Sequence, residues 1–372
     1  MKIALLSVFF PYRGGIAQFG ALLYRALEKR NQVKAYNFKR QYPNLLFPGS
    51  SQYVLPEDDP DEIDSIRLLD TINPVTYRRT AKKINGFAPD ILINQYWMTF
   101  FSPAISGVMK RLNKDIKRIS ILHNVVPHEK RFFDGYANRI FLKHNDGFIV
   151  MSDAVLRDLL SLKPDAKYLR INHPIYSHFG SKQIQDDALG DLNLDRNKKY
   201  LLFFGFIREY KGLDLLLEAI GKLSEDYHLI IAGEVYGSIQ KYTNLINDLG
   251  ISDRVHLFNK YIADDQVATF FSAASVCVLP YKDATQSGII AIADHFDLPC
   301  IVTDVGGLKE NVGHDLTGII VDRPSSELIT KAILDYFEND CYAKFSTAIK
   351  LKKEENSWEN FTDRLLEFSK SL

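Results

Sequence analysis

Short apolar runs alternate with amphipathic helical patterns through both halves of the chain. The runs, each of which predicts a strand, lie at residues 3–10, 33–38, 91–94, 119–123 and 148–151, and again at 200–205, 228–232, 255–258, 276–279 and 300–303. Helical spacing covers residues 18–29 and 77–85. Strands that are apolar throughout are buried on both faces, which is typical of parallel sheets covered by helices. The sequence therefore predicts an α/β protein with two Rossmann-like units in series.

A polar stretch separates the two sets of strands. Residues 176–199 are rich in Asp, Asn, Gln and Ser, which predicts a linker with surface turns. The chain has 372 residues, more than one hydrophobic core usually supports. We therefore place the domain boundary between residues 173 and 174. In open parallel sheets ligands bind at the carboxyl ends of the strands, so the loops after the strands carry the candidate functional residues.

The composition is that of a folded globular enzyme, with 46% hydrophobic and 25% charged residues. The cysteines Cys277, Cys300 and Cys341 are odd in number and lack metal-ligand spacing. We therefore expect neither a zinc site nor a disulfide framework, and a reducing cytoplasm fits best. The apolar run at 3–10 is too short to span a bilayer and lacks a cleavage site, which favours a buried strand over a signal peptide.

Charge is unevenly distributed although it sums to zero. Residues 1–173 carry 26 Lys and Arg against 16 Asp and Glu, whereas residues 174–372 carry 20 against 30. The basic first half indicates an anionic partner, with nucleic acid and the headgroups of a membrane surface as candidates. Mutual attraction of the two halves is the alternative. Because no nucleic-acid recognition motif accompanies the basic half, we expect no nucleic-acid partner.

The loop after the first strand carries Gly14 and Gly15 just before a helix. Glycines let backbone amides approach a ligand, and the amides of a helix start favour an anion such as phosphate. The three-glycine dinucleotide fingerprint and the Walker lysine pattern are absent, which argues against an NAD enzyme or a P-loop ATPase. A tight turn without a ligand is the alternative interpretation.

The loop after the first strand of the second half places Gly205 ahead of Arg208 and Lys211, close to a helix start at about Leu213. A planar guanidinium and a point-charge ammonium together suit a diphosphate. Solvated surface cations are the alternative.

Residues 281–288 lie between another strand and another helix. Thr285 and Ser287 are suitable N-cap residues, and the amides of Gln286, Ser287 and Gly288 would point out of the helix start. This segment is a candidate second phosphate clamp on the same sheet edge, with helix capping alone as the alternative.

Together these residues resemble the retaining GT-B glycosyltransferases of group one, or family four. The similar features span nearly the whole chain, and they are the Gly14-Gly15 loop, His123 in Leu122-His123-Asn124, the cations Arg208 and Lys211, the segment 304–312, and the tail from Ser357-Trp358 into residues 361–368. The resemblance implies two Rossmann-like domains whose parallel sheets face each other across a cleft. It implies an acceptor-binding domain at 1–173, a nucleotide-sugar-binding domain at 174–355, and a C-terminal helix at 356–372 that crosses back to the first domain.

The same resemblance implies an activity, a donor and a location. A sugar would pass, with retention of configuration, from a UDP- or GDP-linked donor to a saccharide or lipid-linked acceptor, in the assembly of a cell-surface polysaccharide or glycan. No permanently bound cofactor and no catalytic metal are implied. We expect the protein in the cytoplasm, with the basic first domain as a candidate for peripheral contact with an anionic membrane.

Roles for individual residues also follow from the resemblance. The catalytic candidates, which include the cations that would stabilise the departing diphosphate, are His123, Arg208, Lys211 and Asp283. The donor-binding candidates are Gly14, Gly15, Gly205, Tyr261, Thr285, Gln286, Ser287 and Gly288. His128 and Glu129 are candidates for positioning the acceptor, or they belong to a solvated loop. A satisfied buried histidine is the alternative for His123.

One departure from the family pattern bears on activity. The family carries two glutamates eight positions apart, near the donor sugar and at the ribose, and these positions fall on Ala284 and Ile292. Asp283 is a candidate substitute for the first, whereas Asp294 would face elsewhere on its helix. A non-catalytic homologue that binds a nucleotide or a partner, and a sugar-nucleotide epimerase, are therefore alternatives.

Two further polar segments have plain interpretations. We interpret the acidic cluster of Asp58, Asp59 and Asp61 as a solvated loop rather than a metal site. The segment with Lys39, Arg40, Tyr42, Leu45, Leu46, Phe47 and Tyr53 mixes cations with apolar rings, which suits a lipid headgroup region or packing against its own domain.

Overall fold

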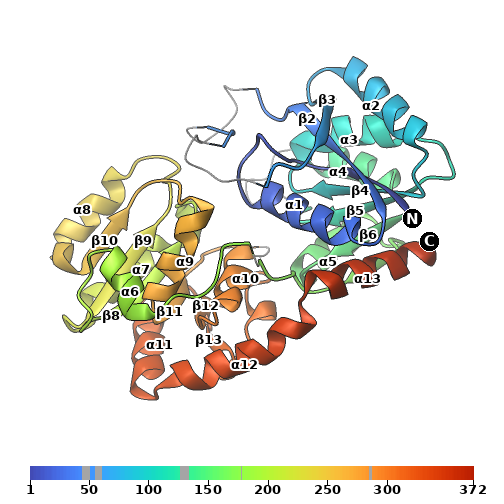
Figure 1. Cartoon of the computed structure of the whole chain (residues 1–372). Coiled ribbons are helices and arrows are strands. Elements are labelled where there is room, and N and C mark those ends of the chain that lie inside the picture. The colour runs from blue at the N-terminus through green and yellow to red at the C-terminus, as the bar shows by residue number, and fades with distance from the viewer. Residues whose placement is uncertain (44–50, 55–60, 126–133, 177, 285–286) are drawn as a thin grey trace. The chain divides into compact units, whose positions relative to one another are not determined.

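The chain folds into two compact α/β units, seen in the computed structural model (Figure 1). The structure describes residues 1–43, 51–54, 61–125, 134–176, 178–284 and 287–372. Unit 1 comprises Met1–Pro56, Pro60–Pro174 and Ser357–Leu372, and unit 2 comprises Glu57–Asp59 and Ile175–Asn356. Among the described residues, no helix combines the length and apolar character needed to cross a bilayer.

Unit 1 contains a seven-stranded sheet in the order β3-β2-β1-β4-β5-β6-β7, with every neighbouring pair parallel. Its strands are β1 (Lys2–Leu6), β2 (Gln32–Arg40), β3 (Ser65–Asp70), β4 (Ile91–Tyr96), β5 (Lys117–Leu122), β6 (Gly147–Val150) and β7 (Tyr168–Arg170). Its helices are α1 (Gly15–Glu28), α2 (Pro74–Phe87), η2 (Thr99–Phe101), α3 (Ser102–Met109), α4 (Asp134–Lys143), α5 (Asp153–Leu162) and α13 (Trp358–Lys370). The strand order reverses between β1 and β4, which is where open sheets bind ligands.

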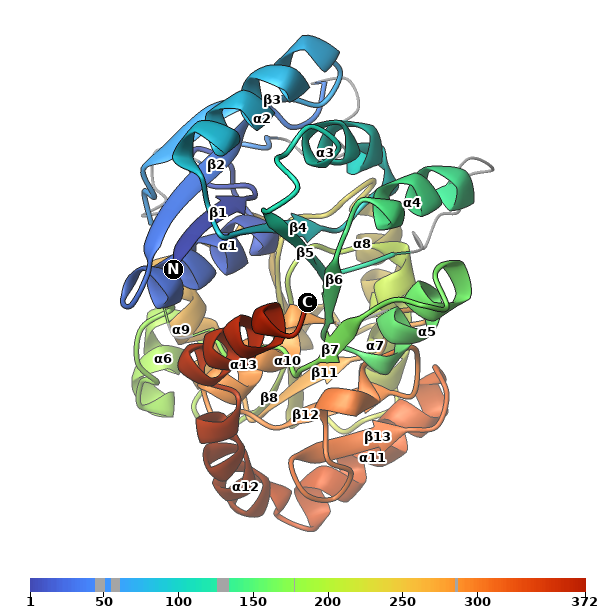
Figure 2. The same cartoon turned by 90° about the vertical axis from the view of Figure 1, so that its right-hand side faces the viewer.

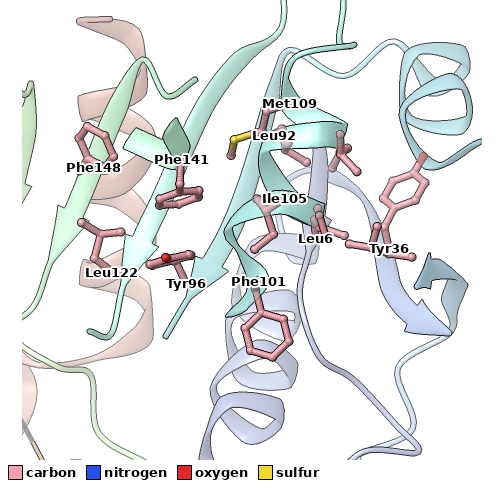
Figure 3. Close-up of a cluster of buried hydrophobic side chains, with 14 of the residues drawn as sticks. Leu6, Tyr36, Leu92, Tyr96, Phe101, Ile105, Met109, Leu122, Phe141 and Phe148 are labelled. Carbon is pink, nitrogen blue, oxygen red and sulfur yellow. The ribbon is translucent and has the colours of Figure 1, made fainter. Parts of the chain in front are cut away.

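Helices cover both faces of the unit 1 sheet. Buried residues of α2, α3, α4 and α5 share one core cluster, and those of α1 and α13 share another. Figure 3 shows the first cluster, in which the rings of Tyr96 and Phe141 stack with centroids 3.9 Å apart. The Tyr96 hydroxyl also donates to the Oδ1 of Asn138, so β4 and α4 are joined by both packing and a hydrogen bond.

Unit 2 repeats the scheme with a six-stranded parallel sheet in the order β10-β9-β8-β11-β12-β13 (Figure 1). Its strands are β8 (Lys199–Phe204), β9 (Tyr227–Ala232), β10 (Val255–Phe258), β11 (Val276–Leu279), β12 (Cys300–Thr303) and β13 (Gly318–Val321). Its helices are α6 (Gln185–Asp191), η3 (Glu209–Lys211), α7 (Leu213–Gly221), α8 (Gln240–Asp248), η4 (Ser252–Arg254), α9 (Asp264–Ala273), α10 (Gly288–His295), η5 (Lys309–Asn311), α11 (Ser326–Glu338) and α12 (Cys341–Glu355). Here the strand order reverses between β8 and β11.

Two predicted segments differ from the structure. The first apolar run covers residues 3–10, but β1 ends at Leu6, and the backbone of Phe9 bonds to the Asn37 side chain instead of a strand backbone. The polar stretch at 176–199 contains α6, whose inner face buries Ala188 and Leu189. The edge strands β3, β7 and β13 were not predicted: β3 and β7 are only partly buried, and β7 and β13 have 3 and 4 residues.

The last helix belongs to the core of unit 1. Phe361 and Leu365 of α13 are 1% exposed, and the rings of Trp358 and Phe361 contact Phe19 of α1. Lys29 of α1 also forms an ion pair of 2.6 Å with Glu359. The first 174 residues of the chain therefore depend on its last 16 for one of their two cores.

We predict that Phe361→Ala destabilises the protein by about 3–5 kcal/mol, since it removes a fully buried ring from a closed core. Urea unfolding followed by circular dichroism would measure the loss. Glu367→Ala, on the exposed side of the same helix, is the matched control and should change stability by less than about 0.5 kcal/mol. Equal effects of the two substitutions would show that α13 does not stabilise unit 1 through this ring.

Candidate functional site

The loops after β8, β9 and β11 are joined to one another at the carboxyl edge of the unit 2 sheet. Gly212 has φ +67°, and a Cβ there would lie 2.1 Å from the carbonyl oxygen of Pro280. Gly233 has φ +153°, and its Cβ would lie 2.2 Å from the oxygen of Gly205. The amide of Lys282 donates to the oxygen of Tyr210 at 2.7 Å. These close approaches require glycine and hold the loop that carries Arg208 and Lys211 in one position.

Lys211 is a buried cation at this edge. Its residue is 8% exposed, and a Cβ on Gly205 would lie 3.5 Å from its Nζ. Within the described part of the chain, its ammonium has neither an ion pair nor a hydrogen bond; its other recorded contact is the ring of Tyr281, with the centroid 5.5 Å away. Burial and then the charge of Arg208 lower the pKa of Lys211 to about 7. A buried ammonium without a counter-ion is the arrangement that a bound anion would complete.

Arg208 lies beside Lys211 in an aromatic setting. Its guanidinium carbon is 4.3 Å from the ring centroid of Tyr236, and it forms no ion pair with any described residue. The ring of Phe206 packs edge-on against that of Tyr236, with centroids 4.8 Å apart. Its centroid lies 6.3 Å from that of Tyr261. The half-buried guanidinium therefore stacks on an aromatic face and keeps its N–H groups for a ligand.

The structure places the described residues of the 281–288 segment as a helix start next to a buried tyrosine. Ser287 is the N-cap of α10, and its Oγ accepts a 3.3 Å hydrogen bond from the amide of Ile289. Gly288 begins the helix, and a Cβ there would lie 3.5 Å from the ring of Tyr176. Thr285 and Gln286 lie outside the described residues, so the proposed clamp is described only at its helical end.

Asp283 is exposed in the same loop. It reinforces the effect of burial in raising the pKa of Tyr210, so its carboxylate lies near that side chain. The adjacent Lys282 pairs with Asp214 at 2.6 Å. Lys282 is thus paired with a carboxylate, whereas Lys211 has no carboxylate partner among the described residues.

The two glutamate positions of the family pattern are apolar and buried, with Ala284 at 3% and Ile292 at 6% exposure. Asp294, two residues further along α10, is bound instead to Lys352 of α12 at 2.8 Å. Its carboxylate therefore serves the packing of α10 against α12. The structure offers no glutamate substitute on α10.

In unit 1, His123 follows β5 and is held in a chain of neutral hydrogen bonds. Its Nε2 lies 2.7 Å from Oε1 of Gln95, and the Nε2 of Gln95 donates to Ser7 Oγ at 2.5 Å. The ring of Phe19 packs edge-on against the imidazole of His123, with centroids 4.8 Å apart. Burial and then His173 lower the pKa of His123 to about 3, so this imidazole is neutral near pH 7 and can offer a hydrogen bond but no positive charge.

Gln95 was missed by the sequence analysis. It is 1% exposed at the end of β4, and it joins the loop after β1 to the loop after β5. A polar residue inside an apolar strand is the signal that could have identified it, because buried amides are retained only where they find partners.

The remaining candidates are placed as follows. Gly14 is the N-cap of α1 with φ +102°, and space for a Cβ is open at both Gly14 and Gly15. His128, Glu129, Asp58, Asp59, Leu45, Leu46 and Phe47 lie outside the described residues. Asp61 pairs with Arg25 at 2.6 Å.

The aromatic segment near residue 42 is engaged within unit 1. Arg40 pairs with Asp70, and the ring of Tyr42 stacks on Phe100. Its described part therefore packs against its own domain, which was one of the two interpretations of its sequence. In the described residues, no group of three or more His, Cys, Asp and Glu side chains is arranged to hold a metal ion.

Known proteins resemble this chain both in sequence and in fold. Residues 185–356 match the family model described as "Glycosyl transferases group 1". The D-inositol 3-phosphate glycosyltransferase of Xylanimonas cellulosilytica is 28% identical over 134 residues, which are 35% of this chain and 32% of that protein. The chain thus aligns with about a third of that relative's length.

Solved structures match the whole chain. Sucrose-phosphate synthase from Thermosynechococcus elongatus superposes with a TM-score of 0.77 at 19% identity, covering 100% of this chain and 98% of that one. Anabaena Alr3699/HepE in complex with UDP superposes with a TM-score of 0.76 at 15% identity, covering 100% of both chains. At these identities the likeness establishes the fold.

The depressed pKa of Lys211 predicts a pH-dependent stability. Between about 7 in the folded state and the ordinary value of 10.5, the unfolded chain binds more protons at this position. Stability from this group therefore rises as the pH rises from 7 to 10. Relative to Lys211→Met, the wild-type protein should gain free energy of unfolding over that range, as measured by urea titrations at each pH.

Lys331→Met is the control, because Lys331 is exposed on α11. The difference in free energy of unfolding between Lys331→Met and the wild type should stay constant with pH. A Lys211→Met profile parallel to the wild-type profile would show that Lys211 is not a buried charge.

Proposed function

We propose that this chain, which belongs through residues 185–356 to the group 1 glycosyl transferases and has the two-unit GT-B fold, transfers a sugar from a nucleoside diphosphate sugar to an acceptor. The observation that carries the proposal is the buried ammonium of Lys211 beside Arg208 at the strand-order reversal of unit 2. Two cations without a carboxylate partner suit the diphosphate of such a donor. HepE of Anabaena, which shares the fold, was solved with UDP, with UDP and glucose, and with UDP-glucose.

Leaving-group stabilisation is the chemistry that these cations would supply. When the bond between the sugar and the diphosphate breaks, negative charge develops on the leaving phosphate oxygen. An anion held there raises the pKa of Lys211 again, so the lysine is charged when the donor is bound. Arg208, fixed on Tyr236, offers paired N–H donors without reorganisation. The amides at the start of α10 would add to this field.

His123 would act on the sugar rather than on the phosphate. Because burial holds it neutral, it cannot contribute a cation, and its role would be a hydrogen bond through the ring or the backbone carbonyl. Gln95 and Ser7 orient the ring. By resemblance to its family, the reaction retains configuration and needs no bound metal.

Donor recognition must replace the two absent glutamates. Asp283 is the candidate for the sugar hydroxyls, because it lies in the loop next to Ala284. For the nucleoside, Tyr261 and Gly205 remain donor-binding candidates, together with Thr285, Gln286, Ser287 and Gly288. We propose a UDP- or GDP-linked sugar as the donor.

The acceptor would be held by unit 1. His128 and Glu129 are the candidates for positioning it, while Gly14 and Gly15, where space for a Cβ is open, remain donor-binding candidates. We propose a saccharide or lipid-linked acceptor, in the assembly of a polysaccharide or glycan; the Xylanimonas relative, named a D-inositol 3-phosphate glycosyltransferase, supports glycosyl transfer without deciding this acceptor.

Removal of either cation should weaken donor binding. We expect Arg208→Ala and Lys211→Met each to raise the Kd for UDP or GDP about 10- to 100-fold, since each loses a charge-assisted hydrogen bond. Titration calorimetry on the purified chain measures this, and Lys331→Met should stay within about twofold of wild type. Wild-type affinity in both variants, or absence of nucleotide binding in the wild type, would contradict the proposal.

The two apolar glutamate positions favour one competing function, a homologue that binds nucleotide without transferring sugar. His123→Ala separates the two. Under the proposal it should abolish donor hydrolysis and transfer while leaving UDP or GDP affinity unchanged, because the cations lie in the other unit. If the wild-type protein binds nucleotide but consumes no UDP- or GDP-sugar with any acceptor tested, the binding function is the correct one.

A further inference from the structure

The two helical layers of unit 1 differ in how their cations are paired. On the layer formed by α1 and α13, Lys29 pairs with Glu359 at 2.6 Å and Arg30 pairs with Asp363 at 3.2 Å. Arg25 of the same layer pairs with Glu28 and Asp61. The charges of this layer are therefore balanced locally.

The opposite layer contains α2, α3, α4 and α5, in which α2 contacts α3 and α3 contacts α4 (Figure 2), and the acids Asp153 and Asp158 of this layer lie on α5. Its outer side carries exposed cations that form no ion pair with any described residue, and we call them the basic face: Arg78, Arg79, Lys82, Lys83, Lys110, Lys114, Arg139 and Lys143. No acidic residue occurs in α2, and the one in α4, Asp134, is buried.

The titration of a nearby histidine reflects this charge. His144 follows α4, and its pKa is lowered by burial and then by Lys110, Lys143 and Arg118. Lys110 after α3 and Lys143 at the end of α4 thus act on the same histidine, so the cations of the two helices combine into one positive field. Such a field attracts an anionic surface.

Exposed apolar side chains accompany the basic face. Val75 of α2 and Ile72 just before it are 56% and 50% exposed, and Tyr136 and Ile140 of α4 are 73% and 38% exposed. Tyr136 and Ile140 are one helical turn apart, and so are Arg139 and Lys143, so rings, aliphatic groups and cations share one side of α4. This combination is typical of helices that lie in a membrane interface.

Topology places these apolar side chains at one edge. Helices that connect parallel strands run against the strand direction, so α2 and α4 both begin near the carboxyl edge of the sheet. Ile72 and Val75 lie at the start of α2 and Tyr136 lies in the first turn of α4, whereas Ile140 is in its second turn. The apolar side chains therefore begin near the carboxyl edge, and the cations Lys110 and Lys143 at the ends of α3 and α4 extend the basic face toward the other edge.

We infer that the basic face and its four apolar side chains dock unit 1 on an anionic phospholipid bilayer, with the outer side of α2, α3 and α4 toward the lipid. Charge complementarity identifies the occupant, because cations without an ion pair to any described residue lie beside exposed apolar side chains, whereas α1 and α13 carry no large exposed apolar side chain and the cations Arg25, Lys29 and Arg30 are paired there. Lipid binding itself does not rest on the proposed function, since it requires neither donor nor transfer. If that function also holds, docking would bring unit 1 close to a lipid-linked acceptor.

Flotation with vesicles tests the inference. The full chain should float with vesicles of phosphatidylcholine containing about one third phosphatidylglycerol, and should not float with phosphatidylcholine alone. Arg79→Glu/Lys83→Glu should lower the partition coefficient about tenfold or more, because each reversal removes one attraction and adds one repulsion. Lys344→Glu/Lys350→Glu on α12 is the control with the same charge change, and it should float like wild type.

Insertion of the apolar tips is tested separately. Tyr136→Trp should be quenched by brominated anionic lipid, whereas Tyr168→Trp, at the exposed edge strand β7, should not. Circular dichroism shows whether each variant is folded. Failure of the wild type to float with anionic vesicles, equal loss in both charge variants, or binding to duplex DNA in preference to vesicles at physiological salt would overturn the inference.

Discussion

An ammonium group buried beside a guanidinium, with no carboxylate partner among the described residues, is the constraint on which the carboxyl edge of unit 2 depends. Such a group costs free energy through desolvation and through repulsion by its neighbour. Burial and then the charge of Arg208 lower the pKa of Lys211 to about 7, so the cost of the buried charge falls when the ammonium loses its proton. Asp214, three residues along the chain, is paired with Lys282 instead.

The surrounding backbone keeps this costly arrangement in place. Gly212 and Gly233 allow the loops after β8, β9 and β11 to approach within distances that no side chain would permit. A flexible lysine would otherwise turn outward and regain water. A local loss of folding stability is typical of a binding site. A ligand of opposite charge that binds there stabilises the folded state again.

The proposed division of chemistry follows from the different electrostatics of the two units. Unit 2 offers positive charge where a leaving diphosphate needs it, while the unit 1 site offers a neutral imidazole held by Gln95. Positive charge in unit 1 lies instead on the outer side of α2, α3 and α4, where it is solvated and unpaired. The proposals thus assign the charge for chemistry and the charge for a surface to different elements.

The sequence by itself determined the two parallel sheets, because continuous apolar strands between helices admit few other folds. It also placed Gly205, Arg208 and Lys211 after a strand, where ligands bind in such sheets, although their role stays a prediction. It did not predict β3, β7 and β13, of which β3 and β7 mix polar with apolar residues and β7 and β13 are short.

Only the tertiary structure decided which polar groups have partners. Local sequence cannot show that Lys211 is buried and unpaired, that Asp294 is taken by Lys352, or that Gln95 holds His123, because each depends on residues distant along the chain. Burial and pairing set the charge state of these groups, and they are properties of packing. The same holds for the basic face: the acids that pair with Lys29 and Arg30 lie on α13, far along the chain, whereas α2 carries no acid and the acid of α4, Asp134, is buried.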